Sequence, residues 1–230
     1  MAKRIDMPVD RFFHDSDLTG EVQLEGAEMH HFHVMRKQAG DTIELVNGHG
    51  SVAKAKVLTL SKKAVLLTIV SLSHTPIPPP QLTLAIPFMR PSKLEFTLEK
   101  CVELGADAFY LYPAQFSEKE NFSTHQMSRL ESIVISAMKQ CGRLDLPSIA
   151  CTSLLDCLSQ ELPLYFGDPI GQKKTIPNDP CIIITGPEKG FSAEEKELLH
   201  QKGSPIRLGD YILRAETAPI AAACAYHLRD

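Results

Sequence analysis

The chain has 230 residues, enough for one large or two small domains, and its hydrophobic fraction of 43% is that of a globular protein. A net charge of −4 excludes the basic excess of a general nucleic-acid binder, and no apolar run approaches the ~20 residues that span a bilayer. The N-terminus lacks the apolar segment of a signal peptide, and the six cysteines form no Cys-x-x-Cys pair. We therefore expect a cytoplasmic protein with reduced thiols and no metal site.

The first third of the chain, residues 1–75, carries mainly strand signals. A compact β-barrel fits this pattern, with a glycine-rich hairpin turn at Asn47-Gly48-His49-Gly50 and one short helix at about 26–38. The predicted strands are Thr42–Asn47, Ser51–Leu58 and Ala64–Val70. A proline-rich linker follows at 76–81, because His74-Thr-Pro-Ile-Pro-Pro-Pro80 favours an extended chain and forbids a helix.

Strands and helices alternate over the rest of the chain, residues 82–230. This alternation predicts a mostly parallel α/β sheet, whose ligands bind beyond the carboxyl ends of the strands. The predicted strands are 82–86, 108–112, 162–166 and 181–185. Four helices are predicted. The first begins at Pro91, and the second runs through Leu130–Met138 and ends at Gly142. The third follows the capping residue Ser192, and the fourth follows Thr217.

Two glycine-bearing segments stand about twenty residues apart near the C-terminus. The first is Ile-Ile-Thr-Gly-Pro-Glu-Lys-Gly-Phe-Ser at 183–192, and the second is Leu-Gly-Asp-Tyr-Ile-Leu-Arg-Ala-Glu-Thr-Ala at 208–218. Each places a glycine after an apolar run, where backbone groups can approach a ligand closely. Such loops are suited to hold an adenine and a ribose, although the same glycines also fit ordinary turns.

These segments resemble the cofactor loops of the SPOUT methyltransferases, in particular the ribosomal RNA small-subunit methyltransferase E family, which methylates N3 of a uridine in 16S rRNA. The Gly-Pro-Glu-Gly-Gly loop is matched at 186–190 except at Lys189, and Leu-Gly-x-Arg-(Ile/Val)-Leu-Arg-Thr-Glu-Thr is matched at 208–217 except at Tyr211 and Ala215. Further motifs follow in the family's order: Arg11-Phe12-Phe13, His31 to Asp41, Lys93-Leu94-Glu95-Phe96, Phe116-Ser117-Glu118-Lys119 and Gln140-Cys141-Gly142-Arg143.

The resemblance implies an α+β two-domain protein with an N-terminal PUA-like β-barrel and a C-terminal SPOUT domain tied in a trefoil knot. It further implies S-adenosyl-L-methionine as cofactor, 16S rRNA of the small ribosomal subunit as partner, and a homodimer. The implied catalytic residues are Arg214 and Glu216. The implied cofactor-binding residues are Gly186, Pro187, Glu188, Gly190, Leu208, Gly209, Ile212 and Leu213. The basic residues expected to meet RNA are Arg4, Arg11, Arg36 and Arg143, with Lys3 and Lys37 beside them.

Structural explanations compete at several of these positions. Glu188 could complement a helix dipole instead of the sulfonium charge of the cofactor. The apolar residues at 208–213 could form strand core, and Arg214 could form a salt bridge with Glu216. Arg143 could serve a dimer contact, and the scattered basic residues could be solvated charges. We expect Lys189 to point toward solvent or RNA phosphate.

Uracil N3 carries a proton that methylation must remove, and either a carboxylate such as Glu216 or water could accept it. Three other functions stay open on sequence alone. They are a non-catalytic RNA-binding protein with this fold, a SPOUT methyltransferase acting on another rRNA or tRNA base, and a nucleotide- or phosphate-binding α/β enzyme. The last is disfavoured because the 186–190 loop lacks the spacing of a P-loop or a dinucleotide site.

Overall fold

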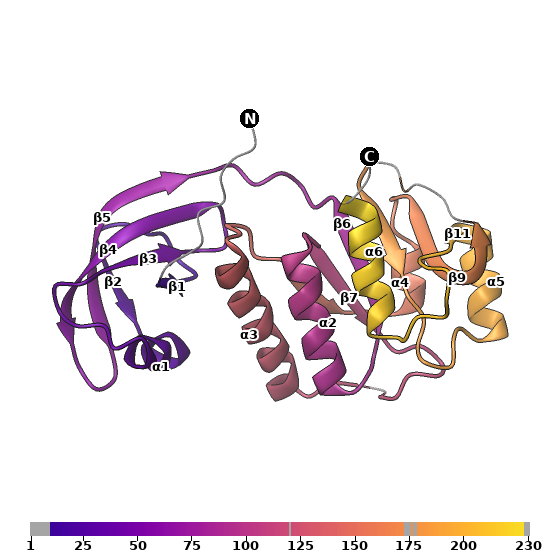
Figure 1. Cartoon of the computed structure of the whole chain (residues 1–230), viewed down its shortest axis with the longest axis horizontal. Helices are drawn as coiled ribbons and strands as arrows, with labels where there is room; N and C mark the ends of the chain where they lie inside the picture. Colours follow the sequence, from indigo (N-terminus) through magenta and orange to yellow (C-terminus); the bar gives the residue numbers. More distant parts are fainter. Residues whose placement is uncertain (1–9, 120, 173–175, 177–178, 228–230) are drawn as a thin grey trace. The chain divides into compact units, whose positions relative to one another are not determined.

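The computed structural model describes residues 10–119, 121–172, 176 and 179–227, which divide into two units (Figure 1). The first unit combines the chain up to Pro78 with the segment Ile135–Leu146. The second contains Pro79–Val134 and the chain from Pro147 onward. Each unit is described separately below.

The N-terminal unit is built on a five-stranded sheet in the order β1-β3-β4-β5-β2. The alternation in β4, where Ala53, Ala55 and Val57 are buried while Lys54 and Lys56 are exposed, turns one face of the sheet toward a core. Helix α1 packs on that face through Phe32, whose ring lies 5.6 Å from that of Phe12. The elements are β1 (Arg11–Phe13), β2 (Glu21–Leu24), α1 (Gly26–Val34), β3 (Thr42–Val46), β4 (Ser51–Leu60) and β5 (Val65–His74).

The β-barrel that the sequence predicted is present, within the described residues, as a half-barrel sheet that does not close. Strands β1 and β2 form its two edges, and no pairing joins them. Both edge strands were missed, because runs of three and four residues are too short to show a clear alternation. The predicted hairpin between β3 and β4 is confirmed, whereas the predicted helix 26–38 ends earlier, at Val34.

Residues 135–146 complete the N-terminal unit from far along the chain. Backbone hydrogen bonds join Gly50 N–H to the Leu144 carbonyl and Leu146 N–H to the Gly48 carbonyl, each at 2.9 Å. Lys139 forms an ion pair with Glu28 of α1 at 2.5 Å. The boundaries 1–75, 76–81 and 82–230 remain a prediction. They leave this segment in the C-terminal domain, because its helical periodicity does not reveal its packing partner.

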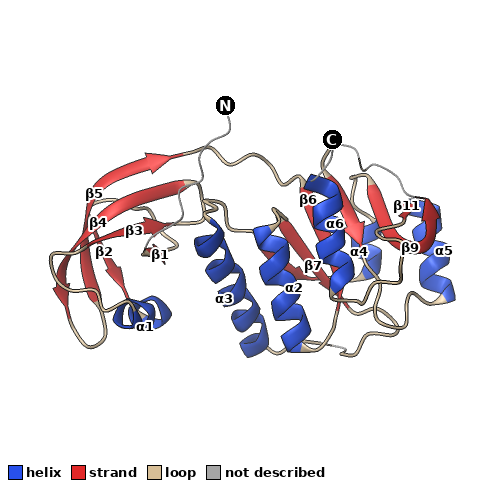
Figure 2. Cartoon of the chain, viewed as in Figure 1, coloured by secondary structure: helices blue, strands red, loops and turns tan. Residues whose placement is uncertain are grey.

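The C-terminal unit is built on a six-stranded parallel sheet in the order β11-β9-β10-β6-β7-β8. Its central strands β6 and β10 are buried along their whole length, as expected for an apolar strand covered on both faces. Helices α2 and α6 pack side by side, and Figure 2 shows both in front of the strands. The strands are β6 (Leu82–Pro87), β7 (Ala108–Tyr112), β8 (Ser148–Cys151), β9 (Leu164–Gln172), β10 (Cys181–Ile184) and β11 (Ser204–Ile206).

The predicted helices of this half are confirmed in their order. They are α2 (Pro91–Glu103), α3 (Thr124–Cys141), α5 (Ala193–Lys202) and α6 (Thr217–His227). Gly142 follows the last residue of α3 with a φ of +88°, the left-handed conformation in which glycine commonly ends a helix. The short elements β8, β11 and α4 (Leu154–Leu158) were not predicted.

Candidate functional site

A cleft of about 230 Å³ opens at the carboxyl ends of β10 and β11, beside residues 166–169 of β9. Because these strands are parallel neighbours, the segments that leave them meet at one edge of the sheet, where ligands of open α/β sheets bind. Three segments line the cleft: 166–169 of β9, 185–191 after β10, and 207–215 after β11. Both glycine-bearing segments singled out in the sequence therefore border one cavity.

The loop after β10 is held by buried hydrogen bonds at both ends. At its start, the buried hydroxyl of Tyr112 donates to the Thr185 carbonyl at 2.7 Å, and burial raises the pKa of Tyr112 well above its usual value, so the phenol stays protonated. At its end, Ser192 caps α5 as predicted, and Glu195 accepts from the backbone N–H groups of Ser192 and Gln115, both at 2.8 Å. The loop is thus fixed before any ligand arrives.

We expect Tyr112→Phe to lower the free energy of unfolding by about 1–3 kcal/mol, because it leaves the buried Thr185 carbonyl without this donor. Urea unfolding measures the change. Tyr110→Phe on the same strand is the control, since Tyr110 is only partly buried. Equal stability of the wild type and Tyr112→Phe would show that the hydrogen bond contributes nothing net.

The two glycines differ in the space around them. A Cβ at Gly186 would lie 3.1 Å from the Phe191 ring, so a larger residue there disturbs the wall as well as the cleft. At Gly209 the nearest atom to such a Cβ is Leu213 Cδ2 at 3.5 Å, an ordinary contact. The protein therefore has room for a Cβ at Gly209, whereas a Cβ at Gly186 would require the Phe191 ring to shift.

Residues 207–216 form an irregular loop, which corrects the reading of Leu208, Ile212 and Leu213 as strand core. All four large residues of this loop border the cleft, although Ile212 and Tyr211 are 85% and 88% exposed; the other two are Leu208 and Leu213. The apolar run alone could not distinguish a strand from a loop whose side chains line a cavity.

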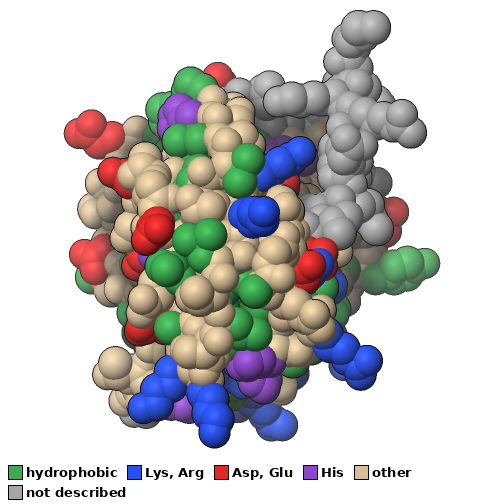
Figure 3. Space-filling model, turned by 90° about the vertical axis from the view of Figure 1, so that its left-hand side faces the viewer, with side chains coloured by type: hydrophobic (Ala, Val, Ile, Leu, Met, Phe, Trp, Pro, Cys, Tyr) green, Lys and Arg blue, Asp and Glu red, His purple; other side chains and the backbone are tan. Residues whose placement is uncertain are grey.

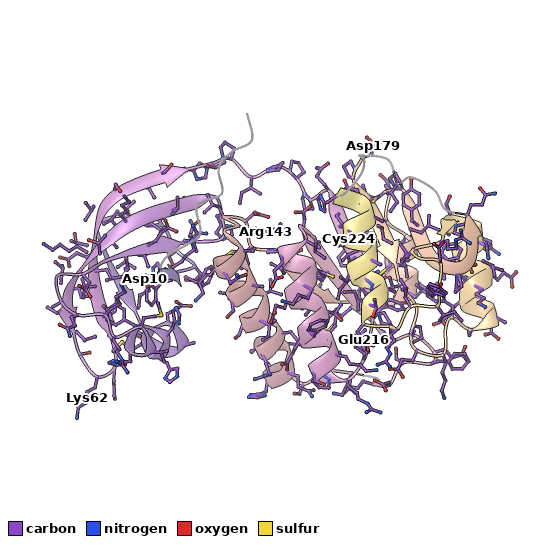
Figure 4. The ribbon with its side chains drawn as sticks, viewed as in Figure 1. Asp10, Lys62, Arg143, Asp179, Glu216 and Cys224 are labelled. Atoms are coloured by element: carbon purple, nitrogen blue, oxygen red, sulfur yellow. The ribbon has the colours of Figure 1, made fainter. Side chains whose placement is uncertain are left out.

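An ionic cluster that the sequence did not predict lies beside the two loops. Lys93, in the first turn of α2, forms an ion pair with Glu188, and its Nζ lies 3.5 Å from Glu216 Oε2. Arg214 Nη1 stands 3.9 Å from the other oxygen of Glu216, so the expected Arg214–Glu216 pair is present. Arg214 is 84% exposed, whereas Glu216 is 15% exposed and lies at the start of α6 (Figure 4). The motif Lys93-Leu94-Glu95-Phe96 includes this lysine, but the sequence predicted only that it lies on a helix.

The predicted RNA-binding residues do not gather into an unpaired basic patch. Arg4 and Lys3 lie outside the described residues. Arg11 pairs with Glu44, Lys37 with Asp10, and Arg143 with Asp145. Arg36 is exposed, as expected of a group that could meet a phosphate. Their contact with RNA stays a prediction.

Basic residues that the sequence reading passed over are also exposed on the N-terminal unit. Lys62 and Lys63 form the tip of the β4–β5 hairpin, and Figure 4 labels Lys62 there. Figure 3 shows this end of the molecule, where Lys and Arg side chains gather at one edge below scattered hydrophobic groups. A separate hollow of about 350 Å³ contains His31, whose pKa is lowered by burial and then by Lys139.

The cleft suits the cofactor that the resemblance implies. Apolar side chains and glycine backbone form much of its wall, which fits a flat base, while Asp168, Lys196 and Arg207 supply polar groups. Arg207 Nε is buried and has no hydrogen-bond partner within the described chain, an unsatisfied donor in the cleft wall. Lys189 is exposed, as expected.

The described residues hold no cluster of His, Cys, Asp or Glu that could bind a metal ion. No disulfide joins the six cysteines, all of which lie within the described ranges. None of the helices in the described ranges is both long enough and apolar enough to cross a membrane.

Comparison with known proteins connects this geometry to a family. Residues 76–227 match the family model of the RNA methyltransferase domain, and residues 24–70 match that of the RNA methyltransferase PUA domain. The chain is 29% identical to ribosomal RNA small subunit methyltransferase E of Rickettsia conorii, over 96% of each chain. It is 30% identical to the Synechocystis protein of the same name, over 87% of this chain and 71% of that one.

A solved structure agrees with these sequence matches. The Neisseria gonorrhoeae ribosomal RNA small subunit methyltransferase E, bound to S-adenosyl methionine, superposes with a TM-score of 0.83 at 27% identity. The superposition covers 97% of this chain and 98% of that one. The likeness therefore extends over both units of the molecule.

Proposed function

The chain belongs to the ribosomal RNA small subunit methyltransferase E family of RNA methyltransferases, and we therefore propose that it methylates N3 of a specific uridine in 16S rRNA. The methyl donor in this proposal is S-adenosylmethionine, which the Neisseria relative binds. The main support is the cleft at the carboxyl ends of β10 and β11, framed by both glycine loops.

In this proposal the chain's own residues hold and orient the cofactor. Gly186, Gly209 and Leu213 place backbone and apolar surface around the adenosine, while Arg207 and Lys196 offer donors to its polar ends. The bound cofactor supplies an electrophilic methyl group on a positively charged sulfur. Holding the acceptor nitrogen in line with that group is the largest contribution that the protein can make.

Arg214 is the residue best placed to act on the uracil. Its guanidinium is exposed beside the cleft and always charged, so it can stabilise the negative charge that develops when N3 loses its proton. Glu216, the other candidate catalytic residue, has one oxygen buried near Lys93 and the other facing Arg214, which suits it to hold Arg214. Water is then the better candidate for the proton acceptor.

Methyl transfer can be tested with small subunits and 16S rRNA from a strain lacking this protein. We expect the purified protein to transfer label from methyl-labelled S-adenosylmethionine to that RNA. A methyl group on N3 blocks Watson–Crick pairing, so reverse transcription should stop at one uridine only after treatment. If the methyl group maps to another base, the protein is a methyltransferase with a different target. If the protein binds the RNA but transfers no methyl group, a non-catalytic RNA-binding protein is favoured.

Two further features belong to the same proposal. After β11 at the sheet edge, the chain returns past the β9 and β10 ends and places α6 against α2 and β6, which supports a trefoil knot. We also propose that the protein is a homodimer acting in the cytoplasm on the small ribosomal subunit, with α6 at the dimer contact. This helix is rich in alanine, which allows close approach of helices.

We expect the full-length protein to sediment as a dimer at micromolar concentration and Ala225→Glu to sediment as a monomer. Ala225 is exposed on α6, so a carboxylate there adds charge to the proposed contact without entering the core. Analytical ultracentrifugation distinguishes the two states. A monomeric wild type would remove the dimer from the proposal and leave the cofactor site unaffected.

A further inference from the structure

Lys93 connects the two cofactor loops through their carboxylates. Glu188 belongs to the loop after β10 and Glu216 to the loop after β11, and both form ion pairs with the one ammonium group of Lys93. The hydroxyl of Thr97, one turn further along α2, donates to the Lys93 carbonyl at 2.8 Å and also lies 3.4 Å from the Glu216 backbone carbonyl. Three segments that are distant in the sequence thus meet beside the cleft.

The charged groups of Lys93 and Glu216 are partly buried, which strengthens their electrostatic effect on nearby groups. The side chains of Lys93 and Glu216 are 27% and 15% exposed, so water screens them less than surface charges. Glu216 Oε2 is fully buried and has no hydrogen bond among the described residues, which leaves Lys93 as its nearest positive charge. Without Lys93, Glu188 would have no ion-pair partner among the described residues, and Glu216 would keep the exposed Arg214.

Such uncompensated carboxylates would slow methyl transfer. The donor carries a positive charge on sulfur that disappears as the methyl group moves to nitrogen. A carboxylate near the sulfur therefore stabilises the reactant more than the transition state, and interactions of that kind lower the rate.

We propose that Lys93 is a positioning residue that neutralises Glu188 and Glu216 and so prevents them from stabilising the sulfonium ion of the bound donor. This inference rests on the proposed function. It revises the expected role of Glu188. The negative charge of Glu188 was expected to balance the sulfonium ion, but in the structure it is paired with Lys93. In this inference Lys93, which lies outside the cleft lining, controls the relative affinity for S-adenosylmethionine and its product S-adenosylhomocysteine.

The two cofactor forms provide a direct test, since S-adenosylmethionine and S-adenosylhomocysteine differ by one methyl group and one positive charge. We expect Lys93→Met to raise the preference for S-adenosylmethionine by about three- to tenfold, the effect of one unit charge several ångströms away. Calorimetry with each ligand measures this ratio without turnover. In kinetics, kcat should fall about tenfold while KM for the donor does not rise.

Charge variants sharpen the test. Lys93→Arg keeps the positive charge and should keep the wild-type ratio, whereas Glu188→Gln removes a negative charge and should shift the ratio toward S-adenosylhomocysteine. Lys100→Met is the matched control, because Lys100 lies on the same helix and pairs with Glu99 and Glu103, neither of which lines the cleft.

Equal loss of both ligands in Lys93→Met would show that Lys93 merely tethers the loops, and an unchanged ratio in Glu188→Gln would show that these charges do not reach the sulfur. Either result overturns the inference while leaving the proposed function in place. A wild-type protein that binds neither ligand would overturn both.

Discussion

Gly209→Val is expected to abolish S-adenosylmethionine binding while the protein keeps its stability. A Cβ at Gly209 meets only ordinary contacts in the protein, and Gly209 lines the cleft, so we expect the valine methyl groups to reduce the space for a ligand there. A loss of about 3 kcal/mol or more in binding free energy, equivalent to a hundredfold in affinity, is the expected size. Calorimetry measures the affinity, and thermal unfolding should place the variant's midpoint close to that of the wild type.

Two further variants show whether this effect comes from the cleft. Gly209→Ala adds only the Cβ and should weaken binding less than valine does. Ala193→Val adds similar volume on the exposed first turn of α5 and should leave binding unchanged. Gly186→Val is a poorer probe, because its Cβ would also press on the Phe191 ring. Undiminished affinity in Gly209→Val would place the cofactor elsewhere.

Arg214→Ala should lower methyl transfer to small-subunit rRNA by about ten- to a hundredfold and leave cofactor affinity nearly unchanged. A charge-assisted contact contributes roughly 1.5–3 kcal/mol, and each ~1.4 kcal/mol is tenfold in rate. Single-turnover assays at saturating cofactor measure the chemical step. Arg214→Lys should recover little activity if the planar guanidinium contacts the uracil or a phosphate.

A second arginine provides the comparison. Arg129 on α3 is exposed and pairs with Glu95, away from the cleft lining, so Arg129→Ala should retain activity. If Arg214→Ala instead loses cofactor affinity and retains turnover at saturation, Arg214 belongs to the cofactor pocket and its assignment to the RNA acceptor is wrong.

The sequence predicted best those elements whose signal is local. Strand β7 has the predicted bounds, and β6 and β10 match within a residue, because continuous apolar runs mark fully buried strands. The glycine loops were identified because glycine after an apolar run is itself a local signal. The N-cap at Ser192 was predicted for the same reason.

Tertiary contacts set the limit of that prediction. Lys93 was visible only as a helical residue, and nothing near it indicates that its ammonium meets Glu188 and Glu216. Tyr112 likewise reads as one more apolar position of β7, although its hydroxyl donates to the Thr185 carbonyl at the start of the loop after β10. The pairing of Arg11 and Arg143 with carboxylates was equally hidden, since each partner is chosen by the fold.

The discontinuity of the N-terminal unit has a consequence for biosynthesis. A ribosome that has released residues up to Pro78 has not yet produced Ile135–Leu146, so Gly48 and Gly50 still lack these backbone partners and Glu28 lacks Lys139. Domains generally fold as units during translation, with the N-terminal one first. In this chain the first unit to emerge must wait, incomplete, until more than half of the polypeptide has been translated.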